Sequence, residues 1–366
     1  MKRTGISDLP LHPGKAPPWL FKRMVRLAGG ITEAIVLEYG QDEFLRRLSD
    51  PYWFQAFGCV LGFDWHSSGL STTTTGALKE GLKENDLGLA FAGGKGAVSR
   101  KTPSEILSLG EKFSLSTKQI EGMQYSSRLS AKVDSAGIQD GYQLYHHFFV
   151  FTEKGKWSVI QQGMNPENKY ARRYHWLSEG VSSFVEEPHT GIVCDSKGKD
   201  VLNMVSRFSE KARKISVDVA KDFPQHKALF SRQSLIQDFL MEKPKILHLP
   251  EHHPIINMGK WNIETLRRAY EIQPQNYEEL ISINGMGPKA IRALALISQV
   301  IYGESPDWED PAKFAFSHGG KDGYPEPVDL NRYSNSIEIL DNAINQSKLG
   351  DKEKVDALKR LGNFIK

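Results

Sequence analysis

The chain has 366 residues and a formal net charge of +3, with 39% hydrophobic and 25% charged residues. This composition is typical of a globular protein with enough chain for two or three domains, and any surface that binds a polyanion must be local. The two cysteines, Cys59 and Cys194, are too few for a disulfide scaffold or a cysteine zinc or iron–sulfur site. No apolar run reaches the roughly 18 residues of a transmembrane helix and no signal-peptide pattern opens the sequence, so we expect a cytoplasmic protein without a membrane partner.

Helical periodicity dominates the first third of the chain. Apolar residues recur at helix spacing through residues 19–61, broken by glycines, and a polar loop then leads into a helix near Thr75. A short strand and the glycine-rich loop "AGGKGAVSRK" follow, and a helix is expected to begin near Pro103. Residues 117–135 have the pattern of one amphipathic helix.

The strongest strand signal is "YQLYHHFFVFTEKGKWSVIQQGM", two aromatic and β-branched runs joined by the turn "EKGK". We therefore predict a β-hairpin. From about residue 201 the pattern becomes helical again, which places a boundary near residues 196–200. The predicted fold class is α+β, with a mixed domain containing the hairpin in residues 1–198 and an all-helical domain in residues 199–366.

The stretch "LISINGMGPKAIRALALIS", residues 280–298, places Gly-Met-Gly-Pro-Lys between two apolar helical patterns. Pro288 suits the first turn of a helix, where its missing N–H has no intrahelical partner. Gly285 and Gly287 allow left-handed backbone angles and close approach of a partner. The free amides and positive dipole end of the second helix, with Lys289 in its first turn, would accept a phosphate oxygen.

This stretch resembles the helix-hairpin-helix motif, in which glycines alternate with hydrophobic residues and an alanine follows three positions later. The matching residues are Ile283, Gly285, Met286, Gly287 and Ala290. The resemblance implies that residues 277–303 bind a DNA backbone through hairpin amides without reading the bases. The alternative is an ordinary helical hairpin with a glycine turn.

The hairpin is also similar to that of the helix-hairpin-helix DNA glycosylases with lyase activity. That resemblance implies a Schiff-base lysine two residues after the second hairpin glycine, at Lys289, and an essential aspartate eighteen residues later, at Asp307. The chain departs from that family because it lacks the glutamine-rich helix and the four-cysteine cluster, and its N-terminal half has no counterpart. The alternative hypothesis for Lys289 is that it binds a phosphate and does not react.

Three other lysines lie near polar loops and are alternative Schiff-base nucleophiles: Lys79, Lys95 and Lys132. A buried lysine with a depressed pKa can condense with the aldehyde of an abasic sugar without a metal. The segment "KYARRYHW" interleaves cations with aromatic rings, and Arg172, Arg173 and Tyr174 are candidates to contact DNA or stack on an unpaired base. The alternative for this segment is a half-buried helix edge.

A second group of polar residues has the chemistry of a metal site: Asp64, His66, His146 and His175. Carboxylates with imidazoles can hold Mg²⁺ or Mn²⁺ and activate water against a phosphodiester. Histidines in an aromatic hairpin are more often hydrogen-bonded core residues than metal ligands, and the adjacent His146 and His147 point to opposite faces of a strand.

Over most of its length the chain is similar to an uncharacterised family of archaea and thermophilic bacteria. The motifs that carry this resemblance are "GFDWHSSG", "LYHHFF", "QQGM", "ARRYHW", "EEPH" and "HGGKDGYPEPVD". The resemblance implies a thermophile-type distribution and, through the helix-hairpin-helix, a role in DNA repair.

Three functions follow, each with DNA as the partner. The first is a repair enzyme that cleaves abasic sites by lyase chemistry through a lysine and requires no cofactor. The second is a structure-specific nuclease that depends on Mg²⁺ or Mn²⁺. The third is a non-catalytic DNA-binding module of a repair complex.

Overall fold

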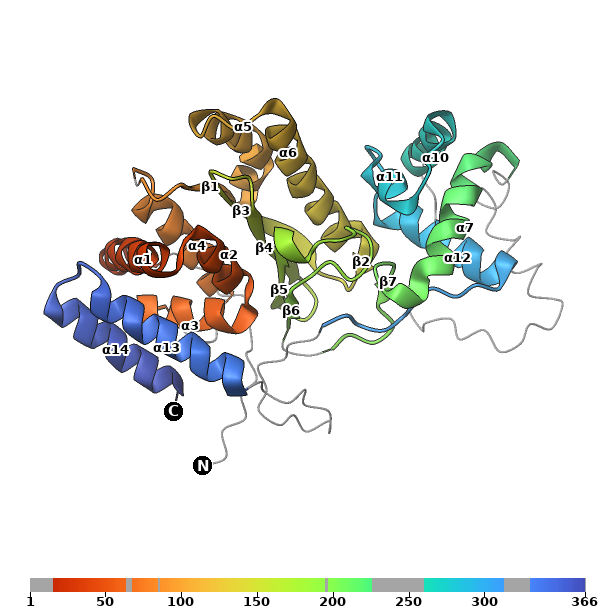
Figure 1. Ribbon diagram of the computed structural model, residues 1–366. Helices are drawn as coiled ribbons and strands as arrows, with labels where there is room; N and C mark the ends of the chain where they lie inside the picture. The colour runs from red at the N-terminus through yellow and green to blue at the C-terminus, as the bar shows by residue number, and fades with distance from the viewer. Residues whose placement is uncertain are drawn as a thin grey trace.

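An antiparallel sheet of five strands, in the order β1-β3-β4-β5-β6, lies at the centre of the molecule (Figure 1). Its strands are Leu89–Lys95, Gln143–Thr152, Trp157–Asn165, Tyr170–Leu177 and Gly191–Val193. The predicted hairpin is confirmed as β3 and β4. The basic aromatic segment is strand β5, not a helix edge. The computed structural model describes residues 16–63, 68–84, 86–194, 197–225, 260–312 and 330–365.

Both faces of the sheet are buried, and consecutive residues of a strand enter different hydrophobic cores. On β3, Phe148 and Val150 pack into one core, whereas Phe149 and Phe151 pack into the other. Side chains alternate between faces along a strand, so burial of both faces explains why this run is almost continuously apolar.

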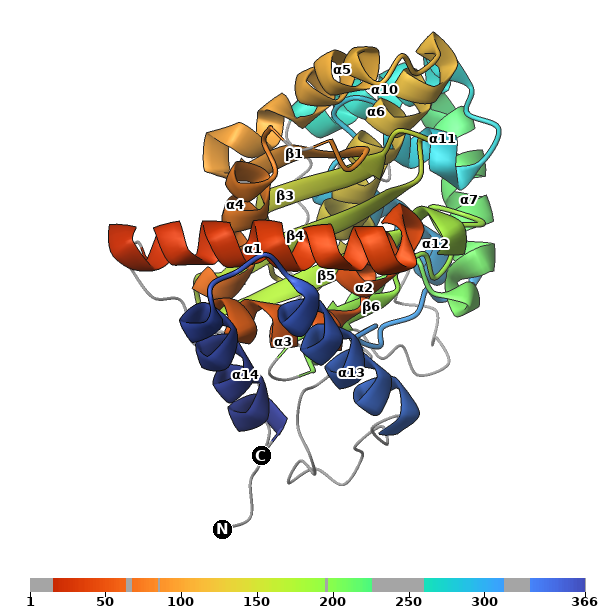
Figure 2. The same cartoon turned by 60° about the vertical axis from the view of Figure 1, so that its left-hand side comes forward.

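Helices from both ends of the chain cover the first face (Figure 2). These are α1 to α4 and the C-terminal pair α13 and α14, at Pro18–Tyr39, Gln41–Ser49, Pro51–Leu61, Gly69–Gly81, Leu330–Gln346 and Asp351–Ile365. The helix expected near Thr75 therefore begins earlier, at Gly69. In both figures α13 and α14 lie beside α1 and α3.

The second face is covered by α5 and α6, and beyond them by α7 and α10 to α12 (Figure 1). These helices span Thr102–Lys112, Thr117–Lys132, Glu210–Lys221, Lys260–Ile272, Tyr277–Ser282 and Pro288–Tyr302. The helices predicted near Pro103 and over 117–135 are confirmed as α5 and α6, the latter extended by a π-helical turn at Val133–Gly137. Ser116 and Gln119 form a capping box that defines the start of α6.

Short elements connect these layers. Strands β2 and β7, Ile138–Gln139 and Leu202–Asn203, form a two-stranded sheet. The 3₁₀ turns η1, η3 and η4 span Gly96–Lys101, Ser178–Gly180 and Arg207–Ser209. No helix in the described ranges is long and apolar enough to cross a membrane.

The packing does not follow the predicted division into residues 1–198 and 199–366. One core joins the second face of the sheet to α7, α10, α11 and α12, and the other joins the first face to α13 and α14. The two cores therefore divide at the sheet and not at residue 198. Local periodicity identifies the helices but carries no information about which face of the sheet they cover.

Candidate functional site

Helices α11 and α12 are joined by a tight turn that contains both glycines of the Gly-Met-Gly sequence. Gly285 has a left-handed φ of +92°, and a Cβ there would lie 2.7 Å from Thr265 Oγ1. Gly285 is thus required by both backbone angle and space. Gly287 has an extended backbone, with φ −107° and ψ −179°, so the expected left-handed angle is wrong for this residue.

The turn presents its polar groups outward and its apolar groups inward. Ile283, Met286 and Ala290 are buried, whereas Lys289 is exposed. Gly287 is the N-cap of α12 and supplies no side-chain hydrogen bond to the first turn. The first amides of α12 are therefore left for an external acceptor.

This helical hairpin is bound to α6 and the segment after it by hydrogen bonds to its own backbone. Lys132 Nζ donates to the carbonyl of Met286 (2.6 Å), and Gln139 Nε2 donates to the carbonyl of Pro288 (2.8 Å). Arg292 Nε in turn donates to Gln139 Oε1 (3.0 Å). The position of the turn is therefore set by residues about 150 positions earlier in the chain.

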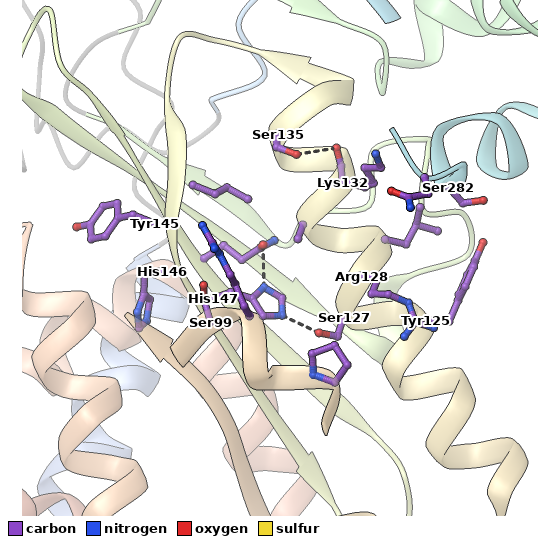
Figure 3. Close-up of a pocket in the computed structure, with 17 residues that line it drawn as sticks. Ser99, Tyr125, Ser127, Arg128, Lys132, Ser135, Tyr145, His146, His147 and Ser282 are labelled. Atoms are coloured by element: carbon purple, nitrogen blue, oxygen red, sulfur yellow. Dashed lines mark hydrogen bonds between the residues drawn. The ribbon is translucent and has the colours of Figure 1, made fainter. Parts of the chain in front are cut away.

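A cavity of about 640 Å³ lies between α6, the start of β3 and the hairpin (Figure 3). Its size is within the range of small-molecule sites. Its lining is Ser99, Arg100, Pro103, Tyr125, Ser127, Arg128, Leu129, Ala131, Lys132, Ser135, Leu144, Tyr145, His146, His147, Gln161, Ser282 and Asn284. None of these 17 residues is acidic, whereas three of them are arginine or lysine. The cavity has the electrostatic character of a site for an anionic ligand.

Lys132 differs from the other three candidate lysines in its surroundings. Burial lowers the pKa of its ammonium below the ordinary 10.5, because a charge is poorly solvated there. Lys79, by contrast, forms an ion pair with Glu105 (2.6 Å), and Lys95 and Lys289 are exposed. Only Lys132 among the four lines the cavity.

A chain of buried hydrogen bonds leads from the cavity wall into the core on the second face of the sheet, and no local sequence pattern predicts it. Ser127 Oγ lies 2.8 Å from His147 Nε2, and His147 Nδ1 lies 2.8 Å from Gln161 Oε1. Gln161 Nε2 donates to Asp134 Oδ2 (2.5 Å), which also accepts from Trp176 Nε1 (3.0 Å). Ser127 and His147 point toward one another in Figure 3.

Of the four predicted metal ligands, Asp64 and His66 lie outside the described residues. His146 and His175 are separately engaged: Thr75 Oγ1 lies 3.1 Å from His146 Nε2, and Arg173 Nε donates to His175 Nε2 (2.8 Å). The part of the chain that the structure describes contains no group of three or more His, Cys, Asp or Glu that could hold a metal. Each of these two imidazoles thus contacts a different partner through Nε2, and the metal site of Asp64, His66, His146 and His175 stays a prediction.

The expectation that Arg172, Arg173 and Tyr174 contact DNA is corrected, since all three are fully buried. Arg172 is paired with Asp310 (2.7 Å) and Asp140 (2.9 Å), and the Tyr174 hydroxyl donates to the same Asp140 (2.6 Å). Burial of both faces of β5 places its cations inside the protein, which the spacing of cations and rings does not reveal.

Asp307, the aspartate that the glycosylase resemblance makes essential, lies in the segment after α12. Asp307 Oδ1 accepts from the backbone N–H of Glu309 (2.9 Å), and its backbone forms an antiparallel bridge with Asn203. Asp307 has a structural role in the segment that follows α12.

The buried histidines predict a pH dependence of stability. Burial lowers the pKa of His146 to about 3 and that of His147 to about 4, from an ordinary 6.5. Below pH 6.5 the unfolded chain therefore binds more protons than the folded chain does. The free energy of unfolding is highest above pH 6.5 and falls as the pH falls toward 4. The loss is about 1.4 kcal/mol per pH unit for each histidine. Urea unfolding of the wild type and of His146→Gln across this range measures the effect.

The difference in pH dependence between the wild type and His146→Gln reports His146 alone, because the other buried groups titrate in both proteins. We expect the free energy of unfolding of His146→Gln to fall less steeply with pH. Identical slopes for the two proteins would contradict the assignment.

No curated protein and no solved structure matches the chain significantly. One family model does, and it is described as "Protein of unknown function (DUF763)". The match covers residues 5–328, which include the sheet, α6 and the helical hairpin. The chain therefore belongs to this uncharacterised family.

Proposed function

We propose that the protein is a cytoplasmic DNA-repair enzyme that cleaves DNA at abasic sites by lyase chemistry, with Lys132 as the nucleophile. The observation that carries the proposal is the position of Lys132: a half-buried amine with a lowered pKa, in a cavity whose lining has no acidic residue, hydrogen-bonded to the turn of the helical hairpin. Nucleophilic lysines need both a neutral amine and an aldehyde held beside it.

The helical hairpin supplies the DNA contact in this proposal. Its turn opens a helix N-terminus with the exposed Lys289 beside it, which suits a backbone phosphate and supports the use of the turn as a helix-hairpin-helix. Ser282 and Asn284 beside the turn also line the cavity. A phosphate on the turn therefore brings the neighbouring sugar to the cavity mouth.

The cationic lining suits the same substrate. Arg100 and Arg128 line the cavity with Lys132, and both are arginines that can hold the phosphates flanking an extruded sugar. The lining of the cavity thus suits an anionic strand.

In the proposed reaction, the Lys132 amine adds to C1′ of the open-chain abasic sugar and water leaves, giving an iminium. Loss of a C2′ proton then allows the C3′–O3′ bond to break, and O3′ leaves with the phosphate. Water hydrolyses the iminium and returns the free lysine. No metal or organic cofactor takes part in these steps.

The test uses an end-labelled duplex with one abasic site and an undamaged duplex as control, each incubated with the full chain in EDTA and in magnesium. We expect cleavage of the abasic strand in EDTA and a covalent adduct after borohydride reduction. Cleavage in magnesium alone would instead support the nuclease, and binding with neither product would support a non-catalytic module.

Gly287→Val provides a separate test of the hairpin. A Cβ at Gly287 meets no atom closer than 3.7 Å and the backbone there is extended, so valine is accommodated in the fold. Its side chain would cover the amides at the start of α12, and we expect the affinity for duplex DNA to fall about tenfold, the loss of roughly one charge-assisted hydrogen bond. Fluorescence anisotropy at fixed salt measures the change.

Gly122→Ala is the matched control, because a Cβ there meets nothing within 4 Å and Gly122 lies on α6 away from the cavity lining. Both variants should unfold at the wild-type temperature within a few degrees. Wild-type affinity in Gly287→Val would remove the hairpin from the DNA interface.

A further inference from the structure

We propose that Ser127 and His147 form the proton-accepting pair of this site, with Ser127 receiving the C2′ proton and passing its own to His147. This inference rests on the proposed lyase function and adds to it the group that drives elimination. It is built on the hydrogen-bond chain that runs from the cavity wall through His147 and Gln161 to Asp134.

The direction of the hydrogen bonds in this chain follows from Asp134. Trp176 Nε1 can only donate, so Asp134 Oδ2 is an acceptor there, and it also receives the Gln161 amide N–H (2.5 Å). Gln161 Oε1 is then the atom that faces His147 Nδ1 (2.8 Å), so Nδ1 carries the proton. His147 Nε2 is consequently unprotonated and accepts the Ser127 hydroxyl (2.8 Å).

This is the arrangement of an activated hydroxyl: a serine donates to an imidazole whose other nitrogen is oriented by a fixed acceptor. Gln161 is itself held by a fully buried carboxylate, so the imidazole has little freedom to turn. Ser127, at the outer end of this hydrogen-bond chain, lines the cavity.

Few other residues that line the cavity could accept the C2′ proton. No lining residue is a carboxylate, and His146 Nε2 is turned toward Thr75, which does not line the cavity. Ser127 lies five residues before Lys132 on α6, about 7.5 Å along the helix axis, and both residues line the cavity.

The electrostatics support the pair. Burial lowers the pKa of His147 to about 4, so the free protein holds it neutral and able to accept a proton. A DNA phosphate in the cavity adds negative charge near the imidazole and raises its pKa toward the working range. His147 releases the proton to water after O3′ has left with the phosphate.

The test compares Ser127→Ala and His147→Gln with Ser130→Ala, in the full chain, under single turnover on the abasic duplex. Ser130 is a matched control because it is a buried serine of the same helix whose hydroxyl donates to the Ser127 carbonyl (3.2 Å), away from the cavity. Two steps are followed separately: borohydride trapping reports iminium formation, and strand cleavage reports elimination.

We expect Ser127→Ala and His147→Gln to be trapped at the wild-type level but to cleave about a hundredfold more slowly, the usual effect of losing a general base. A substrate deuterated at C2′ should then show a larger isotope effect with Ser127→Ala than with the wild type, which a purely structural role would not produce. Ser130→Ala should behave as the wild type does.

Wild-type cleavage and isotope effect in Ser127→Ala, with trapping intact, would overturn the assignment of the pair and leave the lyase standing. Absence of trapping in the wild type would overturn both proposals. If His147→Gln fails to fold, Ser127→Ala still decides the question, since it removes a single oxygen.

Discussion

Replacing Lys132 with arginine should abolish borohydride trapping and lower single-turnover cleavage of an abasic duplex by about a thousandfold or more, the order of effect of deleting a catalytic nucleophile. Arginine retains the positive charge and a donor for the Met286 carbonyl, but its guanidinium stays protonated and cannot attack an aldehyde. The loss would therefore report chemistry and not the position of the hairpin.

The rate of the wild-type enzyme should also rise with pH through the pKa of Lys132, which burial places below 10.5, because only the neutral amine attacks. Lys79→Ala and Lys289→Ala are the controls. We expect the first to be trapped normally despite losing its ion pair with Glu105, and the second to bind DNA more weakly but still to be trapped. Trapping that survives in Lys132→Arg and disappears in Lys289→Ala would move the nucleophile to the hairpin.

Replacing Arg172 with methionine should lower the free energy of unfolding by about 3–5 kcal/mol, because it leaves two buried carboxylates without their cation. Arg172 joins Asp140 on one side and Asp310 on the other, and all three side chains are almost completely buried. It thus ties the segment after α12 to the sheet. Chemical unfolding at neutral pH measures the loss.

The control is Arg26→Met, which breaks an ion pair with Glu353 whose arginine is two-thirds exposed and should cost no more than about 1 kcal/mol. The defect in Arg172→Met should shrink as the pH is lowered. Burial already raises the pKa of Asp140, and a carboxyl that binds its proton more tightly in the folded state gains stability as the pH falls. Equal defects in the two variants would contradict the pairing.

Several features were predictable because they depend on neighbours in the chain. The hairpin of β3 and β4 follows from aromatic runs around a short turn, and the start of α12 follows from Gly-Pro with a helical period behind it. The turn of the helical hairpin was also predicted, although only Gly285 has the left-handed angle that both glycines were expected to have.

The candidate site was predictable only as a set of alternatives. Lys132 was one of four candidate lysines, and nothing local distinguishes it, since its pKa is lowered by burial and its hydrogen-bond partner Met286 is 154 positions away. Arg172 and Arg173 were predicted to contact DNA because their buried partners cannot be recognised locally. These partners, Asp310 and Gln55, are more than 100 positions away in the chain. Ser127 has no motif at all around it.

The sequence by itself determined the α+β class, the strands of the hairpin and the glycine turn ahead of α12, since these depend on periodicity and backbone angles within a few residues. The tertiary structure decided which face of the sheet each helix covers, which cations are buried, and which lysine lies in the cavity. The reason is physical: burial and pKa depend on the solvent and charges excluded around a group, and those are set by parts of the chain far from it in sequence.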